Sequence, residues 1–441
     1  MTQKIREKAV ALKSADDVSD EILALAGDAR FVLIGEASHG THEFYRSRIE
    51  ITKRLIEEKG FSAVAVEADF PDAYRVNRFV RGLGGSDKTA NDALASFTRF
   101  PLWMWRNRDV LEFVEWLKAH NDNLETNAKI GFYGLDLYSL HASMKSVLDY
   151  LESVDPNAAR IARNRYSCFD HFGEDAQSYG YAAGGDAHFS CEDEAVKQLV
   201  ELQKRRAEYV NRHEAVERDE FFFAEQNARL VKNAEEYYRS MFEKRRVSSW
   251  NLRDRHMAET LDELSKHLEE ENRRAKIVVW AHNSHLGDAR ATEMGERGEW
   301  NVGQLIRERY KNEACLIGFT THAGTVAAAD NWDEPAQTKR VLPSHKDSYE
   351  RIFHETALPR FFLNLRDKEI EEILRKPQLE RAIGVVYRPQ TERVSHYFTA
   401  VLSEQFDAVI HFDETSGVVP LDKVSGLSDN ADLPETFPEG V

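Results

Sequence analysis

The sequence has few cysteines and no motif built from them. Its 441 residues include only Cys168, Cys191 and Cys315. Their number is odd and their spacing is wide, so we expect neither a disulfide framework nor a CxxC metal knuckle. Because disulfides are rare in reducing compartments and none is expected here, we predict a cytoplasmic protein.

Long apolar runs and an excess of positive charge are also missing. No run approaches the ~18 apolar residues that a membrane span requires, and the charged N-terminal stretch lacks the apolar core of a secretory signal. The formal net charge of −17 argues against a nucleic-acid surface and against binding to anionic membranes, because both use basic patches. We therefore expect no nucleic-acid partner and no membrane partner.

Short β-branched apolar runs are present, and they alternate with helical stretches. The early runs are apolar on both faces, which is typical of parallel strands covered by helices on each side. The pattern predicts an α/β fold with a mostly parallel sheet flanked by helices. The expected strands are 30–36, 61–67, 129–136, 276–283, 314–322, 325–329, 360–365, 382–387 and 408–414.

A charge-rich helical region interrupts this alternation between about 192 and 274. We interpret it as part of a large helical subdomain inserted into the α/β domain. A polar, glycine-rich loop is expected at 167–191, and long loops of this kind are often functional. The predicted organisation is an α/β catalytic domain at 1–140 and 275–424, a helical insert at 141–274, and a flexible acidic tail at 425–441.

Ionisable side chains follow the carboxyl ends of the expected strands. In open α/β sheets, ligands bind in the crevice beyond these ends. If the strands are parallel neighbours, the side chains converge at one edge of the sheet. The residues concerned are, in chain order, Glu36, His39, Glu67, Asp136, His282, His285 and His322.

An arginine falls within the apolar stripe of the first long helix. The helix is expected to begin near Thr41, and Arg48 lies in the middle of its stripe. A buried guanidinium requires carboxylate or carbonyl acceptors because an unpaired buried charge is costly. Helical side chains lean toward the helix N-terminus, which aims Arg48 at Glu36, His39 and Glu67. We predict a positioned, charge-balanced imidazole; the structural alternatives are a helix-capping histidine and a salt bridge between Arg48 and Glu67.

Several longer motifs resemble the erythromycin esterase family from about residue 30 to residue 422. They are "GEASHGTHEFYRSR", "AVEADFPDAYRVNRFVRG", "FPLWMWRNRDVLEFVEWL", "VVWAHNSHLGD" and "YRPQTERVSHYFTAVLSEQFDAVIHFDET". The resemblance implies a metal-independent ester hydrolase that needs no cofactor, with a deep cleft between an α/β domain and a helical one. Some members open the lactone ring of macrolide antibiotics.

The resemblance also implies roles for individual residues. The histidine that matches His39 is the general base that activates water in that family. The other matched site residues are Glu36, Arg48, Glu67, His282 and His285.

The chemistry of these residue types agrees with that role. Ester hydrolysis needs a nucleophile and stabilisation of an oxyanion, and histidine is the natural base near neutral pH. Either Glu36 or Glu67 would hold the imidazole, and Arg48, His282 or His285 would face the developing oxyanion. The expected partner is a small-molecule ester or lactone, including the macrolactone of a macrolide.

Other residues are candidates for substrate contact. The segment "FPLWMWRNRD" is too polar for a plain core helix, so Trp103, Trp105 and Arg106 are expected to line the cleft, although such an aromatic cluster is often core. Asp136 and His322 are further candidates. Tyr138, Arg253, Asp254, His396 and Tyr397 are expected either to touch the ligand or, more simply, to brace the site.

Three alternatives stay open. His282 and His285 form an H-x-x-H that, with Glu36 and His39, would make a zinc or manganese set, although we expect no metal. Ser38 in "EASHG" would be a nucleophile, but the hydrolase elbow is G-x-S-x-G. A binding protein that does not turn its ligand over is the third.

Overall fold

The structure is a computed structural model that describes residues 1–173, 175–185, 190–210, 215–242, 246–270 and 274–422. The predicted tail at 425–441 lies outside these residues. Within them, no helix combines the length and apolar character needed to cross a membrane.

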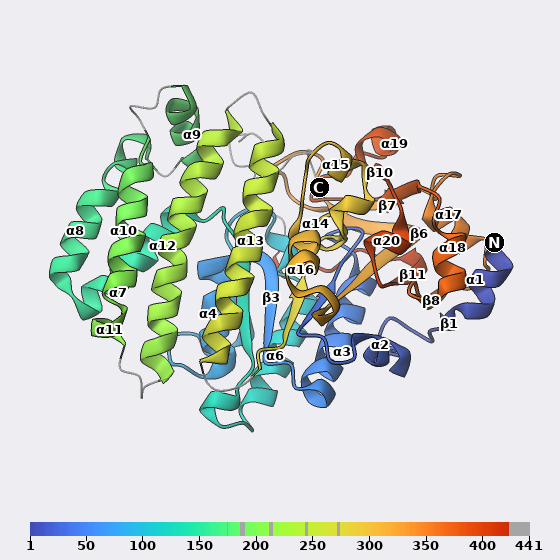
Figure 1. Cartoon of the computed structure of the whole chain (residues 1–441), viewed down its shortest axis with the longest axis horizontal. Helices are drawn as coiled ribbons and strands as arrows, with labels where there is room; N and C mark the ends of the chain where they lie inside the picture. The colour runs from blue at the N-terminus through green and yellow to red at the C-terminus, as the bar shows by residue number, and fades with distance from the viewer. Residues whose placement is uncertain (174, 186–189, 211–214, 243–245, 271–273, 423–441) are drawn as a thin grey trace.

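A nine-stranded mixed sheet lies at the centre of the fold (Figure 1). Its middle is parallel from β11 to β4, whereas β1, β8 and β7 pair in antiparallel fashion. The predicted α/β fold with a mostly parallel sheet is therefore confirmed. In spatial order the strands are β1 (Val10–Ala11), β8 (Arg360–Asn364), β11 (Ala408–Thr415), β6 (Ala314–Ala328), β2 (Phe31–Ile34), β5 (Ile277–Trp280), β3 (Ala63–Asp69) and β4 (Gly131–Asp136), with β7 (Gln337–Val341) paired to β6.

Both faces of the sheet are covered, as the strand composition predicted. Alternate residues of β2 belong to separate apolar cores: Phe31 and Leu33 to one, Val32 and Ile34 to the other. The second core also takes side chains from α2, α3, α4 and α6, and the first from α7, α12, α13, α16 and α17. The helices outside the region between β4 and β5 are α1 (Thr2–Lys8), α2 (Asp20–Ala26), α3 (His42–Lys59), α4 (Phe70–Arg81), α5 (Ala90–Leu94), α6 (Arg108–Asn121), α14 (Asn283–Leu286), α15 (Glu293–Glu296), α16 (Val302–Tyr310), α17 (Tyr349–His354), α18 (Lys368–Ile373), α19 (Glu392–Ser395) and α20 (Leu402–Gln405).

Two strand predictions were wrong. The segments 314–322 and 325–329 form the single strand β6, which passes through Gly324 at φ 131°; a Cβ there would lie 2.0 Å from the Thr415 carbonyl oxygen. The segment 382–387 is not a strand, because Ile383 and Val386 bridge to different neighbours instead of one. A separate two-stranded sheet joins β9 (Gln378–Arg381) to β10 (Tyr397–Ala400).

Between β4 and β5 the described residues form helices and no strand. These helices gather on one side of the sheet in Figure 1, and α13 contacts β4. The domain boundaries themselves stay a prediction. The helices are α7 (Leu140–Val154), α8 (Pro156–Tyr166), α9 (Ala176–Gly185), α10 (Glu192–Lys204), α11 (Arg206–Tyr209), α12 (Ala215–Met241) and α13 (Arg246–Glu269).

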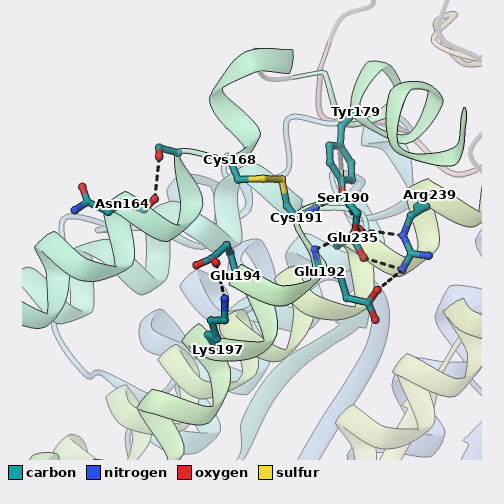
Figure 2. The surroundings of a disulfide bond; sticks show 11 residues. Asn164, Cys168, Tyr179, Ser190, Cys191, Glu192, Glu194, Lys197, Glu235 and Arg239 are labelled. Carbon is teal, nitrogen blue, oxygen red and sulfur yellow. Dashed lines mark hydrogen bonds and ion pairs between the residues drawn. A yellow bond between two sulfur atoms is a disulfide. The ribbon is translucent and has the colours of Figure 1, made fainter. Parts of the chain in front are cut away.

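The expected loop at 167–191 is largely helical and carries a disulfide (Figure 2). Its described part contains a 3₁₀ turn at Phe169–Phe172 and α9. Cys168 and Cys191 are bonded, with their Cα atoms 5.9 Å apart. The expectation of no disulfide is therefore wrong, because packing of α8 against α10 brings together two cysteines that are 23 positions apart. The argument for a reducing compartment loses its basis, and Cys315 is a buried free thiol.

Candidate active site

The turns after β2 and β5 lie against each other because the first contains a glycine. A Cβ on Gly35 would lie 2.2 Å from Oδ1 of Asn283, so any other residue would push the turns apart. The backbone N–H of Asn283 donates to the Glu36 carbonyl oxygen at 2.8 Å. This close approach brings the residues that follow β2 next to those that follow β5, and the rings of His39 and His282 are 4.9 Å apart.

Arg48, Glu36 and His39 form a buried chain in which an ion pair is followed by a hydrogen bond. Nη2 of Arg48 lies 2.7 Å from Oε2 of Glu36, and Oε1 of Glu36 lies 2.9 Å from Nδ1 of His39. The three residues are at most 3% exposed. The guanidinium also lies over the rings of Tyr45 and Trp280, at 4.4 and 5.3 Å, where cation–π attraction favours it.

This chain assigns the tautomer of His39. Arg48 can only donate, so it stabilises Glu36 as a carboxylate, which accepts hydrogen bonds. Nδ1 of His39 therefore carries the proton that it donates to Glu36. The second nitrogen, Nε2, is left with a lone pair, which is what a general base requires.

A second charged network is centred on Arg253 of α13. Its guanidinium donates to Glu67 at 2.7 Å and to both carboxylate oxygens of Asp136, at 3.0 and 2.7 Å. The network joins the ends of β3 and β4 to the helical region. Burial opposes the ionisation of Glu67, but the charge of Arg253 and the backbone N–H of His282 help to hold its pKa well below the ordinary value. Arg253 likewise outweighs burial and lowers the pKa of Asp136.

The same arginine fixes His285. Nη1 of Arg253 lies 2.9 Å from Nε2 of His285, and Nδ1 of His285 lies 2.9 Å from Oδ1 of Asp254. Since a guanidinium only donates, Nε2 accepts and Nδ1 donates its proton to Asp254. Both ring nitrogens are therefore engaged, and His285 holds the turn after β5 in place.

His282 has one ring nitrogen that forms no well-aligned hydrogen bond with the described residues. Its backbone N–H donates to Oε2 of Glu67 at 2.8 Å, and its Nδ1 accepts from the N–H of Ser284 at 3.2 Å. The proton of the neutral ring is then on Nε2, which is buried. Burial and the neighbouring His39 lower the pKa of His282 well below its ordinary value. The ring is thus a neutral donor close to His39.

A pocket opens in front of His39. One side carries charged residues from both networks, and the other carries aromatic and apolar side chains. The lining residues are His39, Glu67, Ala68, Asp69, Asp72, Phe97, Arg99, Phe100, Pro101, Met104, Trp105, Asp136, Tyr138, Arg253, Trp332 and Val385.

The structure brings some of the expected substrate-contact residues to this pocket and not others. Trp105 and Asp136 line it, whereas the described lining does not include Trp103, Arg106 or His322. Trp103 packs against Phe100, and Arg106 forms an ion pair with Asp422. His322 stacks on His354 with ring centroids 3.7 Å apart, because β6 continues past the strand end that the sequence predicted.

Arg253 and Asp254 are more central than the sequence indicated. Both are buried in the stripe of α13 that also carries Trp250, Met257 and Leu261. A charged pair inside an apolar stripe is the signal that singled out the arginine of α3, and it was available here too. Asp72 and Arg99, by contrast, carried no sequence signal that we recognised.

The open alternatives have less support from these contacts. Among the described residues, no group of three or more His, Cys, Asp or Glu side chains is arranged to hold a metal ion. The hydroxyl of Ser38 is hydrogen-bonded to that of Thr41, whereas a nucleophilic serine needs a base as its partner.

Three proteins illustrate what the chain resembles. It is 23% identical over 340 residues to erythromycin esterase type II of Escherichia coli, covering 72% of this chain and 75% of the relative. A crystal structure of a Bacillus cereus protein shares the fold at a TM-score of 0.78 and 20% identity, covering 96% and 98% of the two chains. The structure of a mutant of erythromycin esterase EreC in its open conformation shares the fold at a TM-score of 0.65 and 18% identity, covering 94% of this chain and 99% of that one.

The family assignment rests on most of the chain. The matched region begins at residue 56, inside the last turns of α3, so Glu36, His39 and Arg48 precede it. Over residues 56–415 the sequence matches the model of the erythromycin esterase family, and the chain belongs to that family of hydrolases.

Proposed function

We propose that this protein hydrolyses a carboxylic ester or lactone with a water molecule that His39 activates. The observation that carries the proposal is the buried Arg48–Glu36–His39 chain. It leaves the lone pair of Nε2 free on a residue that lines the pocket. A base of this kind contributes about 10²–10⁴-fold to the rate.

The reaction can be written with every proton accounted for. Nε2 of His39 takes a proton from water while the water oxygen attacks the ester carbonyl carbon. Glu36 stabilises the imidazolium that forms, as the acid partner does in other histidine-dependent hydrolases. When the tetrahedral intermediate collapses, the carbon–oxygen bond to the alcohol breaks, and His39 returns the proton to the departing alkoxide.

Two groups can stabilise the oxyanion. Arg253 lines the pocket and is held rigidly by carboxylates on β3 and β4. The Nε2–H of His282 forms no well-aligned hydrogen bond with the described residues, and its ring lies beside that of His39. Preorganised donors of this kind are worth about 10²–10³-fold each. Arg48 and His285, by contrast, are engaged with partners and act as positioning residues.

The substrate class follows from the family and the pocket. Relatives are named erythromycin esterases, so a macrolactone is one candidate, and the apolar wall of the pocket suits the hydrocarbon part of an ester. The test is to incubate the full chain with simple esters and several macrolactones and to look by mass spectrometry for addition of one water. His39→Asn is the control. Hydrolysis that depends on His39 is expected, whereas binding without hydrolysis of any compound would favour a non-catalytic binding protein.

A further inference from the structure

Asp69 precedes helix α4, but its side chain does not cap the helix. It is the N-cap residue, yet its carboxyl accepts no hydrogen bond from the first turn. Pro71 removes one of the N–H groups that it would otherwise accept from. The side chain is 8% exposed, Oδ2 is paired with Arg99 at 2.9 Å, and Oδ1 has no hydrogen-bond partner among the described residues. A buried carboxylate oxygen without a partner is costly, so this position is suited to a ligand.

Asp72, three residues further along the chain, is a second carboxyl of this kind in the same pocket. Its carboxyl forms no hydrogen bond or ion pair with the part of the chain that the structure describes, and it lines the same pocket. Burial, followed by the charge of Asp69, raises its pKa to about 8; Arg99 and Arg75 oppose this effect. Asp69 and Asp72 thus present two neighbouring carboxyls, with too few cations to balance them, to a ligand in the pocket.

The two aspartates stand where two cavities meet. Asp69, Asp72, Arg99 and Tyr138 line both the pocket of His39 and an outer cavity. The outer cavity continues along the helical region, where its walls include Ser139, His141, Asp175, Gln177 and Tyr238. A molecule whose ester lies at His39 therefore extends past the aspartate pair.

The surroundings of the pair fit an organic cation better than a metal ion. Four carboxyls but only two guanidiniums line the inner pocket: Glu67, Asp69, Asp72 and Asp136 against Arg99 and Arg253. Aromatic rings face the same space, from Phe97, Phe100, Trp105, Tyr138 and Trp332. Carboxylates combined with aromatic faces recognise substituted ammonium groups, whereas hard metal ions prefer a shell of oxygen ligands.

We propose that Asp69 and Asp72 form a subsite for the alkylammonium group of a cationic ester. The proposal rests on the proposed function only for the ester part, because the ammonium subsite would exist whether or not the ligand is hydrolysed. The cation neutralises the pair and packs against the aromatic wall, which sets the distance from the charged nitrogen to the scissile carbonyl. Specificity for charged esters over neutral ones follows.

Two esters of the same shape test this specificity. Acetylcholine and 3,3-dimethylbutyl acetate differ in one atom, a positive nitrogen against a neutral carbon. The kcat/KM of the cationic ester is expected to exceed that of the neutral one by about tenfold or more, a factor that corresponds to about 1.4 kcal/mol. In Asp69→Asn and Asp72→Asn the ratio falls toward one, whereas the exposed control Asp122→Asn keeps it. A ratio near one in the unaltered protein would overturn the proposal.

Binding of the cation alone separates this proposal from the proposed function. Tetramethylammonium is titrated into the full chain by calorimetry at pH 7, in two buffers with different heats of ionisation. Binding is expected to release protons, because the cation displaces the proton held by Asp72, and to weaken at least tenfold in Asp69→Asn. Thermal unfolding of each variant shows that it is folded. If tetramethylammonium binds in this way but no ester is cleaved, the proposed function fails and the subsite stands; if esters are cleaved and the cation does not bind, the subsite fails alone.

Discussion

Nη1 of Arg253 lies 2.9 Å from Nε2 of His285, and both side chains are buried. Through this contact a helix from the middle of the chain sets the protonation state of a histidine on the turn after β5. Asp254, the next residue on the helix, accepts the other ring proton. The edge of the sheet that carries the candidate active site therefore depends on the docking of α13.

Replacing Asp254 tests this dependence. Asp254→Asn removes the negative charge that orients His285, so we expect kcat/KM for ester hydrolysis to fall by about tenfold or more. Because the residue acts through another, its pH–rate profile is also expected to change. Glu259→Gln, on the same helix and partly exposed, is the matched control. An unchanged rate and profile in Asp254→Asn would show that the contact is only structural.

The buried pair of Arg48 and Glu36 leads to a double-mutant test. Arg48→Met leaves a carboxylate buried without its cation, which is expected to lower the free energy of unfolding by about 3–5 kcal/mol. Adding Glu36→Gln removes that charge and is expected to restore part of the stability but none of the activity. Chemical denaturation and ester assays measure the two effects. Activity that returns together with stability would mean that the pair serves the fold alone.

The disulfide gives a prediction that needs no substrate. In the unfolded, unreduced chain, thiol titration is expected to find one reactive thiol, from Cys315, and three after reduction. Replacing Cys168 and Cys191 by alanine together is expected to lower the free energy of unfolding by about 2–4 kcal/mol, because the cross-link restricts the unfolded chain. Cys315→Ala is the comparison. Three thiols before reduction would contradict the bond.

Glu380 supplies a pH-dependent prediction. It is buried and accepts from Nδ2 of Asn283 at 3.2 Å, and burial, followed by the nearby Glu350, raises its pKa to about 8. In the unfolded chain a glutamate ionises near about 4.3. The folded state therefore holds a proton that the unfolded state loses, so this group's contribution to stability is present below pH ~4.3 and declines as the pH rises to about 8.

Glu380→Gln mimics the protonated form and removes this decline. At pH 8 the variant is expected to be more stable than the unaltered protein, by about 4–5 kcal/mol, because each pKa unit corresponds to about 1.4 kcal/mol, and at pH 4 nearly equal to it. Denaturation midpoints at the two pH values measure the difference. The exposed Glu404→Gln is expected to show no such change, and a variant that is less stable at pH 8 would reverse the assignment.

The local part of the site could be predicted from the sequence. Strand ends and helical periodicity were enough to place Glu36, His39 and Arg48 in one cluster, because a short turn joins the strand to the helix. The inward-facing arginine was the informative residue, since a buried charge requires a partner of opposite charge or a hydrogen-bond acceptor. Gly35 then allows the second turn to approach, which sequence alone did not reveal.

The remaining contacts depend on docking between distant segments. Arg253 and Glu67 are 186 positions apart in the sequence, and hydrophobic periodicity does not predict which strand α13 packs against. The disulfide was missed for the same reason. His322 was placed at a strand end because the sequence analysis expected separate strands at 314–322 and 325–329. In the structure, Gly324 allows one strand to continue through this point against β11.

The central claim is that His39 is the base, and it is tested most directly by His39→Asn. The measurement is kcat/KM for the best ester found, with thermal unfolding of the same preparation. We predict a loss of about 10²–10⁴-fold in kcat/KM with an unfolding transition close to that of the unaltered protein. A folded His39→Asn variant that hydrolyses the ester at the unaltered rate would contradict the account.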